Sequence, residues 1–246
     1  MLWGSFGVVH IISLIAAAAL IVGLHFLLKG RSQRVQTAVL GVLSFSGIAA
    51  IIFNLVTWGS PLEYLPLHLC SLNAMALPIA VFTRNKAANN LLLLWALGAV
   101  FALVVNTAQA NYEIISATFA FYYFPHVLEI GIPILMFTLG LVKKDLRCIG
   151  STLAITLICY TAIHFINLGV NAYTVANNCV DYAGNVISVN YMYSLYPENP
   201  MLALMYSLIP QPYFYMLLAI PIIAVYLLAV YAGEWIPLLK RRKMKV

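Results

Sequence analysis

The chain has 246 residues, of which 63% are hydrophobic and 8% are charged, and its 13 Lys and Arg outnumber its 7 Asp and Glu. Soluble domains average about 45–50% apolar and about 25% charged residues. So few charges cannot build a water-facing surface, which excludes a soluble globular domain, and the high hydrophobicity excludes intrinsic disorder.

The formal net charge of +6 does not indicate a nucleic-acid partner. The basic residues form short clusters between apolar runs, where the topology signals of a membrane protein belong. We therefore expect membrane lipids as partners and no nucleic acid, and the oligomeric state stays open. The sequence predicts an all-α fold, a polytopic membrane bundle of helices.

Seven apolar segments remain when the chain is cut at its charged and Pro/Gly-rich breaks. A bilayer core of about 30 Å takes about 20 helical residues, so each segment is long enough to be considered as a span. We expect the first to stay in the mature protein, because no basic region or small-residue cleavage site marks it as a signal peptide. Together they predict a single bundle domain over residues 1–246. The predicted spans are 5–28, 35–58, 66–83, 88–106, 118–142, 149–172 and 213–238.

The charges predict the orientation of these spans. Every Lys and Arg lies in a connection from an odd-numbered to an even-numbered span or in the C-terminal tail, which carries the Lys240–Lys245 cluster. The other connections carry acidic residues such as Glu63 and Glu113 and neither Lys nor Arg. The positive-inside rule then places the N-terminus outside and the C-terminus in the cytoplasm. We expect a multi-pass protein of the plasma membrane.

One long connection, residues 173–212, is expected on the outer side. It is rich in Asn, Tyr and Pro, and it exceeds the usual loop length, which is typical of a lid, a re-entrant segment or a binding loop. Cys179 in this loop is expected to be a free thiol, whereas Cys148 and Cys159 lie in apolar surroundings and are expected to pack there.

Polar side chains of several spans are predicted to meet in the outer half of the membrane, where their cost marks them as functional candidates. Span three begins with His68, Cys70 and Asn73. Span five carries His126 and Glu129, three residues apart and therefore on one helical face. The other members are His10 on span one, Asn54 on span two, and His164, Asn167 and Asn171 on span six.

A Cys and a His at matched depth on different helices can act as nucleophile and base, because a thiol attacks as its thiolate and an imidazole accepts the proton. Glu129 or an Asn would orient the imidazole, as in a catalytic triad. Two alternatives stay open on the sequence alone. In the first, Cys70 packs and the histidines make interhelical hydrogen bonds. In the second, a zinc ion with an open position for water is held by His68, His126, His164 and Glu129.

Five short segments carry a resemblance to a known family. The more specific two are Leu65–Ser71, which contains His68-Leu69-Cys70, and the stretch from Asn190-Tyr191-Met192-Tyr193 through Pro197. On these residues the chain resembles the YwaF-type family of bacterial integral membrane proteins. That family is similar to the animal transmembrane protein 164 family, acyltransferases that act on ether lysophospholipids. The remaining segments are Trp95–Ala99, Phe124–His126 and Pro210–Tyr213.

The resemblance implies that Cys70 takes up an acyl group and that His126 assists as general base. The two residues are 56 positions apart (126 − 70), a spacing similar to that in the animal relative. It also favours a bacterial membrane as the location.

The first hypothesis is therefore an intramembrane acyltransferase or transacylase acting on phospholipid or lipid-linked acyl groups near the outer leaflet, with no metal and no cofactor. His68, Asn54 and Asn73 are candidates to stabilise the oxyanion, and Tyr191, Tyr193 and the long loop are expected to cover the acyl chain. The rivals are a transporter or small-molecule-binding membrane protein, which would use the same polar cluster, and an intramembrane zinc-dependent hydrolase. The candidate substrate-binding residues are His68, Asn54, Asn73, Glu129, His164, Asn167, Asn190 and Tyr191.

Overall fold

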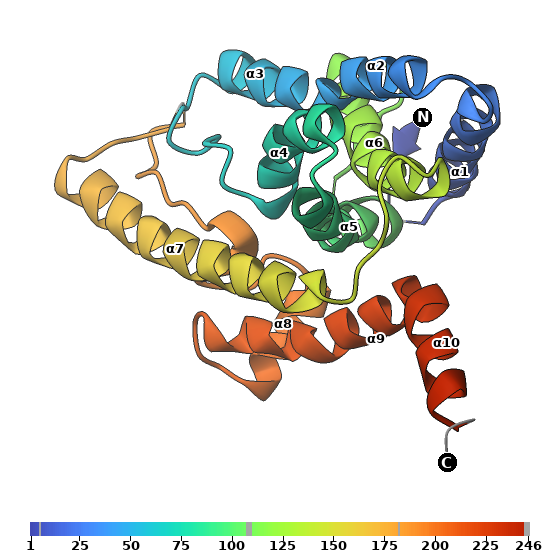
Figure 1. Cartoon of the computed structure of the whole chain (residues 1–246). Coiled ribbons are helices and arrows are strands. Elements are labelled where there is room, and N and C mark those ends of the chain that lie inside the picture. Colours follow the sequence, from blue (N-terminus) through green and yellow to red (C-terminus); the bar gives the residue numbers. More distant parts are fainter. Residues whose placement is uncertain (5, 107–109, 182, 244–246) are drawn as a thin grey trace.

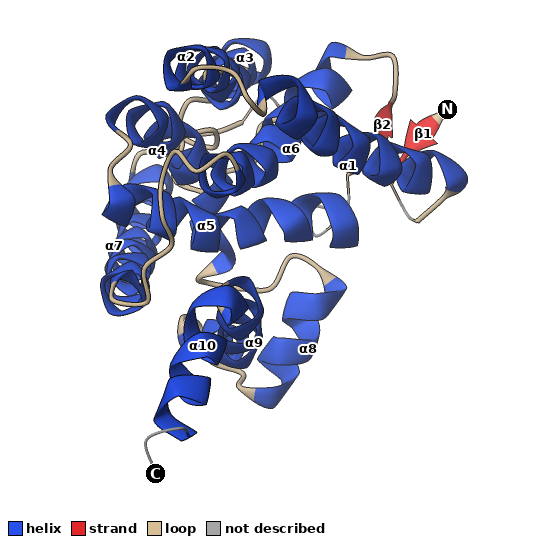
Figure 2. Cartoon of the chain, turned by 45° about the vertical axis from the view of Figure 1, so that its right-hand side comes forward, coloured by secondary structure: helices blue, strands red, loops and turns tan. Residues whose placement is uncertain are grey.

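The computed structural model describes residues 1–4, 6–106, 110–181 and 183–243, which fold into a bundle of helices (Figure 1). Two strands of two residues each, β1 (Leu2–Trp3) and β2 (Tyr112–Glu113), pair antiparallel beside the first helix (Figure 2). A π-helix covers Phe101–Val105, and 3₁₀-helices cover Tyr191–Tyr193 and Phe214–Ala219. The α-helices are α1 Val8–Leu28, α2 Gln33–Ser44, α3 Ser46–Trp58, α4 Leu69–Thr83, α5 Lys86–Val100, α6 Ala117–Thr138, α7 Cys148–Ala176, α8 Pro200–Leu208, α9 Ile220–Val230 and α10 Ala232–Lys243.

Several of these helices have the length and composition of membrane spans. Five candidate spans are found within the described residues, and each falls on a segment that the sequence predicts to cross the bilayer. The other two predicted spans correspond to shorter apolar helices, Leu69–Thr83 and Phe214–Val230. The candidate spans are Val8–Leu28, Gln33–Trp58, Lys86–Val105, Ala117–Thr138 and Cys148–Ala176.

Local chemistry moves some boundaries away from the predicted ones. The segment 35–58 is divided at Phe45, because the Ser44 hydroxyl donates to the Gly41 carbonyl at 2.6 Å and competes with the helical bonds there. Helix α6 ends at Thr138 rather than at 142, since Gly140 adopts a left-handed conformation with φ +74°. The segment 213–238 is a 3₁₀-helix, α9 and α10 in succession. Of the predicted basic tail, Met244 and Lys245 lie outside the described residues.

The long connection that the sequence predicts on the outer side is folded rather than extended. It begins after Ala176, later than the predicted residue 173, and contains the 3₁₀-helix Tyr191–Tyr193 and the helix α8. Its side chains pack in a separate hydrophobic cluster against α7 and the residues that lead into α4. The members from the loop are Ile187, Val189, Tyr191 and Met192, and their neighbours include Leu62, Leu65 and Leu67.

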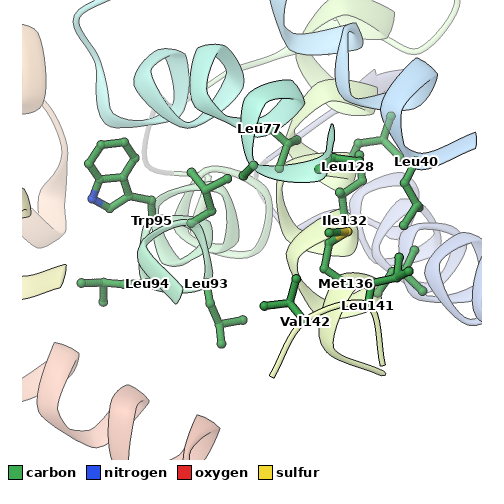
Figure 3. Packing of buried hydrophobic residues seen from close by; sticks show 14 of the residues in the cluster. Leu40, Leu77, Leu93, Leu94, Trp95, Leu128, Ile132, Met136, Leu141 and Val142 are labelled. Carbon is green, nitrogen blue, oxygen red and sulfur yellow. The ribbon is translucent and has the colours of Figure 1, made fainter. Parts of the chain in front are cut away.

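The largest hydrophobic cluster lies between α2, α4, α5 and α6 (Figure 3). Leu77 of α4 and Ile132 and Met136 of α6 are almost completely buried in it. These residues lie C-terminal to Cys70 and His126 on the same two helices. Packing of the C-terminal halves therefore fixes how the N-terminal halves, with their polar side chains, face each other.

Helices α8, α9 and α10 lie together at one side of the bundle (Figures 1 and 2). Hydrogen bonds tie α9 and its C-terminal end to α5. The Tyr226 hydroxyl donates to the Leu93 carbonyl at 2.5 Å, and the Tyr231 hydroxyl donates to Asn90 Oδ1 at 2.6 Å. In the connection after α6, Lys144 Nζ donates to the Val230 carbonyl at 2.7 Å.

Close contact between α3 and α4 depends on Gly47. A Cβ atom at this position would lie 2.5 Å from Cβ of Ala74, whereas a Cβ at Gly23 of α1 would meet no atom within 4 Å. We expect Gly47→Ala to push the two helices apart and to lower the free energy of unfolding by about 1–3 kcal/mol. Gly23→Ala is the matched control and should leave stability unchanged or slightly raised. Thermal unfolding in detergent measures both, and equal stability of the two variants would contradict the expected close packing.

Candidate functional site

A cavity of about 200 Å³ lies between the N-terminal parts of α4 and α6 and one side of α3, from Gly47 to Trp58. Its wall contains Cys70, His126, Glu129 and Asn54, four of the residues that the sequence singles out. Aromatic side chains complete the wall, from α3, the connection between α3 and α4, the strand β2 and α6. They are Trp58, Tyr64, Tyr112, Phe121 and Tyr122.

Cys70 lies in the first turn of α4. His68 is the N-cap, with extended backbone angles (φ −71°, ψ 155°), so that the helix begins at Leu69 and Cys70 is its second residue. The first N–H groups of a helix have no intrahelical acceptor, and the N-terminal end of the helix dipole favours negative charge. At this position backbone N–H groups can bind an oxyanion that forms beside the Cys70 thiol.

His126 is held in one orientation by its own helix. Its Nδ1 lies 2.6 Å from the carbonyl oxygen of Tyr122, and the two rings pack with centroids 4.6 Å apart. A carbonyl can only accept, so Nδ1 carries the proton, and Nε2 of the neutral ring is left as an acceptor. The orienting partner is thus a backbone carbonyl, whereas the sequence suggests Glu129 or an Asn for this role.

Glu129 and Asn73 are buried beside each other with unused hydrogen-bonding capacity. Glu129 is 3% exposed and Asn73 is 0% exposed. Within the described residues, Glu129 Oε2 and both amide atoms of Asn73 make no hydrogen bond of normal geometry. An unpartnered buried polar group costs about 1–3 kcal/mol, so it calls for a partner that binds there. Glu129 lines the cavity, whereas Asn73 does not line it and interacts with Glu129.

The polar side chains that form the predicted stripe on α7 make hydrogen bonds to the long loop in the structure. Asn167 Nδ2 donates to the Tyr191 carbonyl at 2.8 Å, and its Oδ1 accepts from the Tyr191 N–H at 3.0 Å. His164 Nδ1 lies 3.1 Å from Ser194 Oγ. Asn171 makes the same kind of paired contact with Val189, at 2.9 Å and 2.7 Å. None of these α7 side chains lines the cavity.

Asn190 and Tyr191 also serve the loop rather than the cavity wall. Asn190 Oδ1 accepts from the Leu195 N–H at 2.9 Å, and its Nδ2 donates to the Tyr196 carbonyl and to Glu198, both at 2.8 Å. The Tyr191 hydroxyl donates to the Leu62 carbonyl in the segment before α4. Burial raises the pKa of Tyr191 to about 12, so this donor keeps its proton at physiological pH.

His68 connects the loop with the helix that carries Cys70. Its Nδ1 accepts from the Met192 N–H at 3.3 Å, and its ring packs against Tyr191 and Tyr193 with centroid distances of 5.5 Å in both cases. His10, the remaining histidine of the predicted cluster, is buried elsewhere, with Nε2 2.6 Å from the Leu103 carbonyl. Apart from His10 and Asn73, the polar groups that the sequence predicts in the outer half therefore divide into a set that lines the cavity and a set that holds the loop.

The arrangement bears on a metal site as well. Among the described residues, no three His, Cys, Asp or Glu side chains gather closely enough to hold a metal ion. Of the four predicted zinc ligands, His126 and Glu129 line the cavity, while His68 and His164 contact the loop. The zinc alternative stays a prediction, and no ligand cluster among the described residues supports it.

Sequence reasoning missed two contributions to the site. One is the helix start at Leu69, whose signal is Pro66 shortly before an apolar run. The other is Tyr122, which stands four residues before His126 and therefore one helical turn away from it. A histidine one turn after an aromatic residue on the same helix indicates this contact.

Comparison with known proteins gives one finding. The model described as the TMEM164 family matches residues 5–230, a range that contains α1 to α9 and every residue of the cavity wall. No match is found among curated proteins or among solved structures.

Proposed function

Since the chain belongs to the TMEM164 family, we propose that it is an intramembrane acyltransferase that moves acyl groups between phospholipid or lipid-linked molecules. The observation that carries this proposal is the shared cavity. One wall presents a thiol in the first turn of a helix, and another presents an imidazole whose Nδ1 is fixed and whose Nε2 is an acceptor. These are the two parts that thioester chemistry requires.

The first half-reaction acylates Cys70. His126 Nε2 takes the thiol proton, and the thiolate attacks the carbonyl carbon of the lipid ester. The N–H groups of the first turn of α4, with Asn54 of the cavity wall, bind the oxyanion. The ester C–O bond breaks, the leaving alkoxide takes the proton from His126, and a thioester remains on Cys70.

The second half-reaction passes the acyl group on. The acceptor hydroxyl or amine gives its proton to His126 Nε2 and attacks the thioester carbonyl. The C–S bond breaks, and the Cys70 thiolate recovers the proton. One base therefore serves both halves, and the reaction as proposed needs no cofactor. Glu129 lines the cavity, and its Oε2 makes no hydrogen bond within the described residues, so this atom is available to the polar part of the lipid.

The size of the cavity supports a lipid substrate of which only the reacting part enters. An apolar cavity of about 150 Å³ holds a benzene molecule, so about 200 Å³ holds an ester group and a few adjoining carbons. The acyl chains must then lie outside, along the apolar surface of the helices. Ile52 and Val56 of α3, the helix that forms one wall, are exposed and offer such a surface.

A direct test uses purified protein in vesicles of phosphatidylcholine with a labelled acyl chain, to which lysophospholipid is added. We expect labelled acyl groups to appear on the lysophospholipid, detected by mass spectrometry of the lipids. Vesicles without protein give the background. Folded protein that transfers no acyl group to lysophospholipids with different headgroups would contradict the proposal.

We also infer that α4 and the helical segment Phe214–Val230 cross the membrane, which gives seven crossings with the N-terminus outside and the C-terminus in the cytoplasm. The support is the charge pattern, because every Lys and Arg then faces the cytoplasm. The cavity and the long loop would lie toward the outer face of the plasma membrane.

Thiol labelling in intact cells tests this orientation. Cys179 of the long loop is expected to react with a membrane-impermeant maleimide without permeabilisation, because it lies outside and forms no disulfide. A cysteine at exposed position 31, introduced as Arg31→Cys in a Cys179→Ala background, should react only after permeabilisation. The reverse pattern would contradict the orientation.

A further inference from the structure

The segment Tyr191–Ser194, named the strap here, has an unusual backbone. Met192 and Tyr193 are consecutive, neither is glycine, and both adopt the left-handed region with φ +53° and φ +55°. Bulky side chains avoid this region, and a residue stays there only where its surroundings over-determine it. The strap is therefore held in place by its contacts rather than by its own preference.

Three elements hold the strap. On the α7 side, Asn167 Nδ2 donates to the Tyr191 carbonyl at 2.8 Å and to Ser194 Oγ at 2.9 Å. On the side of the 3₁₀-helix Phe214–Ala219, the Tyr215 hydroxyl donates to the Tyr193 carbonyl. On the α4 side, the Met192 N–H donates to His68.

The strap packs two rings against His68, those of Tyr191 and Tyr193, and of these two Tyr193 is the one that interacts electrostatically with Cys70. The Tyr193 ring packs against His68, which stands two residues before Cys70, with a centroid distance of 5.5 Å. Burial raises the pKa of the Tyr193 phenol, and the charges of Cys70 and Glu198 raise it further, so the phenol stays neutral beside the thiol. Tyr193 does not line the cavity, so it approaches Cys70 from the strap, whereas His126 and Glu129 lie in the cavity wall.

A thioester on Cys70 can react in two ways. Attack by a lipid acceptor completes transfer. Attack by water at the same carbonyl breaks the C–S bond, returns the proton to the Cys70 thiol and releases a free fatty acid. A transferase must exclude water from a reactive intermediate. The strap belongs to the loop that the charge pattern predicts on the outer, water-exposed side of the membrane.

We propose that Tyr193 is a positioning residue that shields the Cys70 thioester from water and so directs the acyl group to a lipid acceptor. This inference rests on the proposed function, because it requires the thioester to form. The strained backbone of the strap, held from three sides, serves to keep the phenol ring against His68, two residues before Cys70.

The test measures the partition of the acyl group. Protein acylated in detergent is separated from donor lipid, and the lifetime of the thioester and the ratio of free fatty acid to transferred product are followed by mass spectrometry. We expect Tyr193→Ala to shorten the lifetime and raise the ratio by about tenfold, because the water barrier is lost. Tyr193→Phe keeps the ring and should stay close to the wild type. Tyr196→Ala removes an exposed ring of the same loop and is the matched control.

A second variant covers the case that Tyr193→Ala does not fold. Asn167→Ala keeps Tyr193 but removes two donated bonds that hold the strap on α7, and we expect the same rise in the ratio. A merely structural role would lower the amount of acylated protein and leave the ratio unchanged, which would overturn the inference. If wild-type protein forms no thioester at all, the proposed function itself fails, so the two failures are distinguishable.

Discussion

Cys70→Ala is expected to abolish acyl transfer while the protein still folds. The proposed mechanism passes every acyl group through the thiol, and removal of an attacking nucleophile lowers turnover by at least about 10³-fold. The fold should tolerate the change, because alanine keeps the Cβ atom and suits the first turn of α4. The measurement is the rate of label transfer between lipids in vesicles, with thermal unfolding as the check of folding.

Cys159→Ala is the matched control for this prediction. Cys159 lies on α7, is a free thiol like Cys70, and does not line the cavity. Cys159→Ala should transfer acyl groups at the wild-type rate. A Cys70→Ala protein that transfers acyl groups at the wild-type rate would show that Cys70 is not the nucleophile, and the first alternative, in which it only packs, would then hold.

His126→Asn is expected to slow acyl transfer by about 10²–10⁴-fold, the usual contribution of a general base. The substitution distinguishes the roles of the two ring nitrogens. An asparagine amide can still donate to the Tyr122 carbonyl, as Nδ1 does at 2.6 Å, but it has no counterpart of Nε2. The local structure is kept and the base is lost, so the rate should fall while the melting temperature stays close to that of the wild type.

His164→Asn provides the comparison for the histidine. His164 lies on α7 and contacts Ser194 of the strap, away from the cavity wall. It should retain most of the transfer rate. Equal rates for His126→Asn and the wild type would exclude His126 as the base, and equal losses in both histidine variants would contradict a specific role of His126 in proton transfer.

Much of the fold follows from composition and segment length. The apolar runs that become α1, α5, α6 and α7 are long enough to be recognised as helical spans, because a bilayer sets both their length and their composition. The breaks inside segments are local events. The turn at Phe45 depends on one hydroxyl, that of Ser44, and the end of α6 depends on one glycine conformation at position 140. The hydropathy of the sequence predicts neither of these two breaks.

The candidate site is predictable in part for a related reason. Alternating direction and known rise per residue give the depth of each polar side chain, and depth alone brings Cys70, His126, Glu129 and Asn54 to one level. The depth of a side chain in the membrane does not determine which element packs against that face of its helix. The stripe of His164, Asn167 and Asn171 shares one face of α7, but its partners are backbone groups of a loop that hydropathy leaves undefined.

Intact-protein mass spectrometry determines whether Cys70 carries the acyl group. Protein purified in mild detergent is mixed with phospholipid, and its mass is measured before and after treatment with hydroxylamine, which cleaves thioesters. We expect an added acyl mass that hydroxylamine removes, that maps to Cys70, and that is absent from Cys70→Ala and slow to form on His126→Asn. Lipid acyl transfer by folded protein without an adduct on Cys70 would contradict the thioester mechanism.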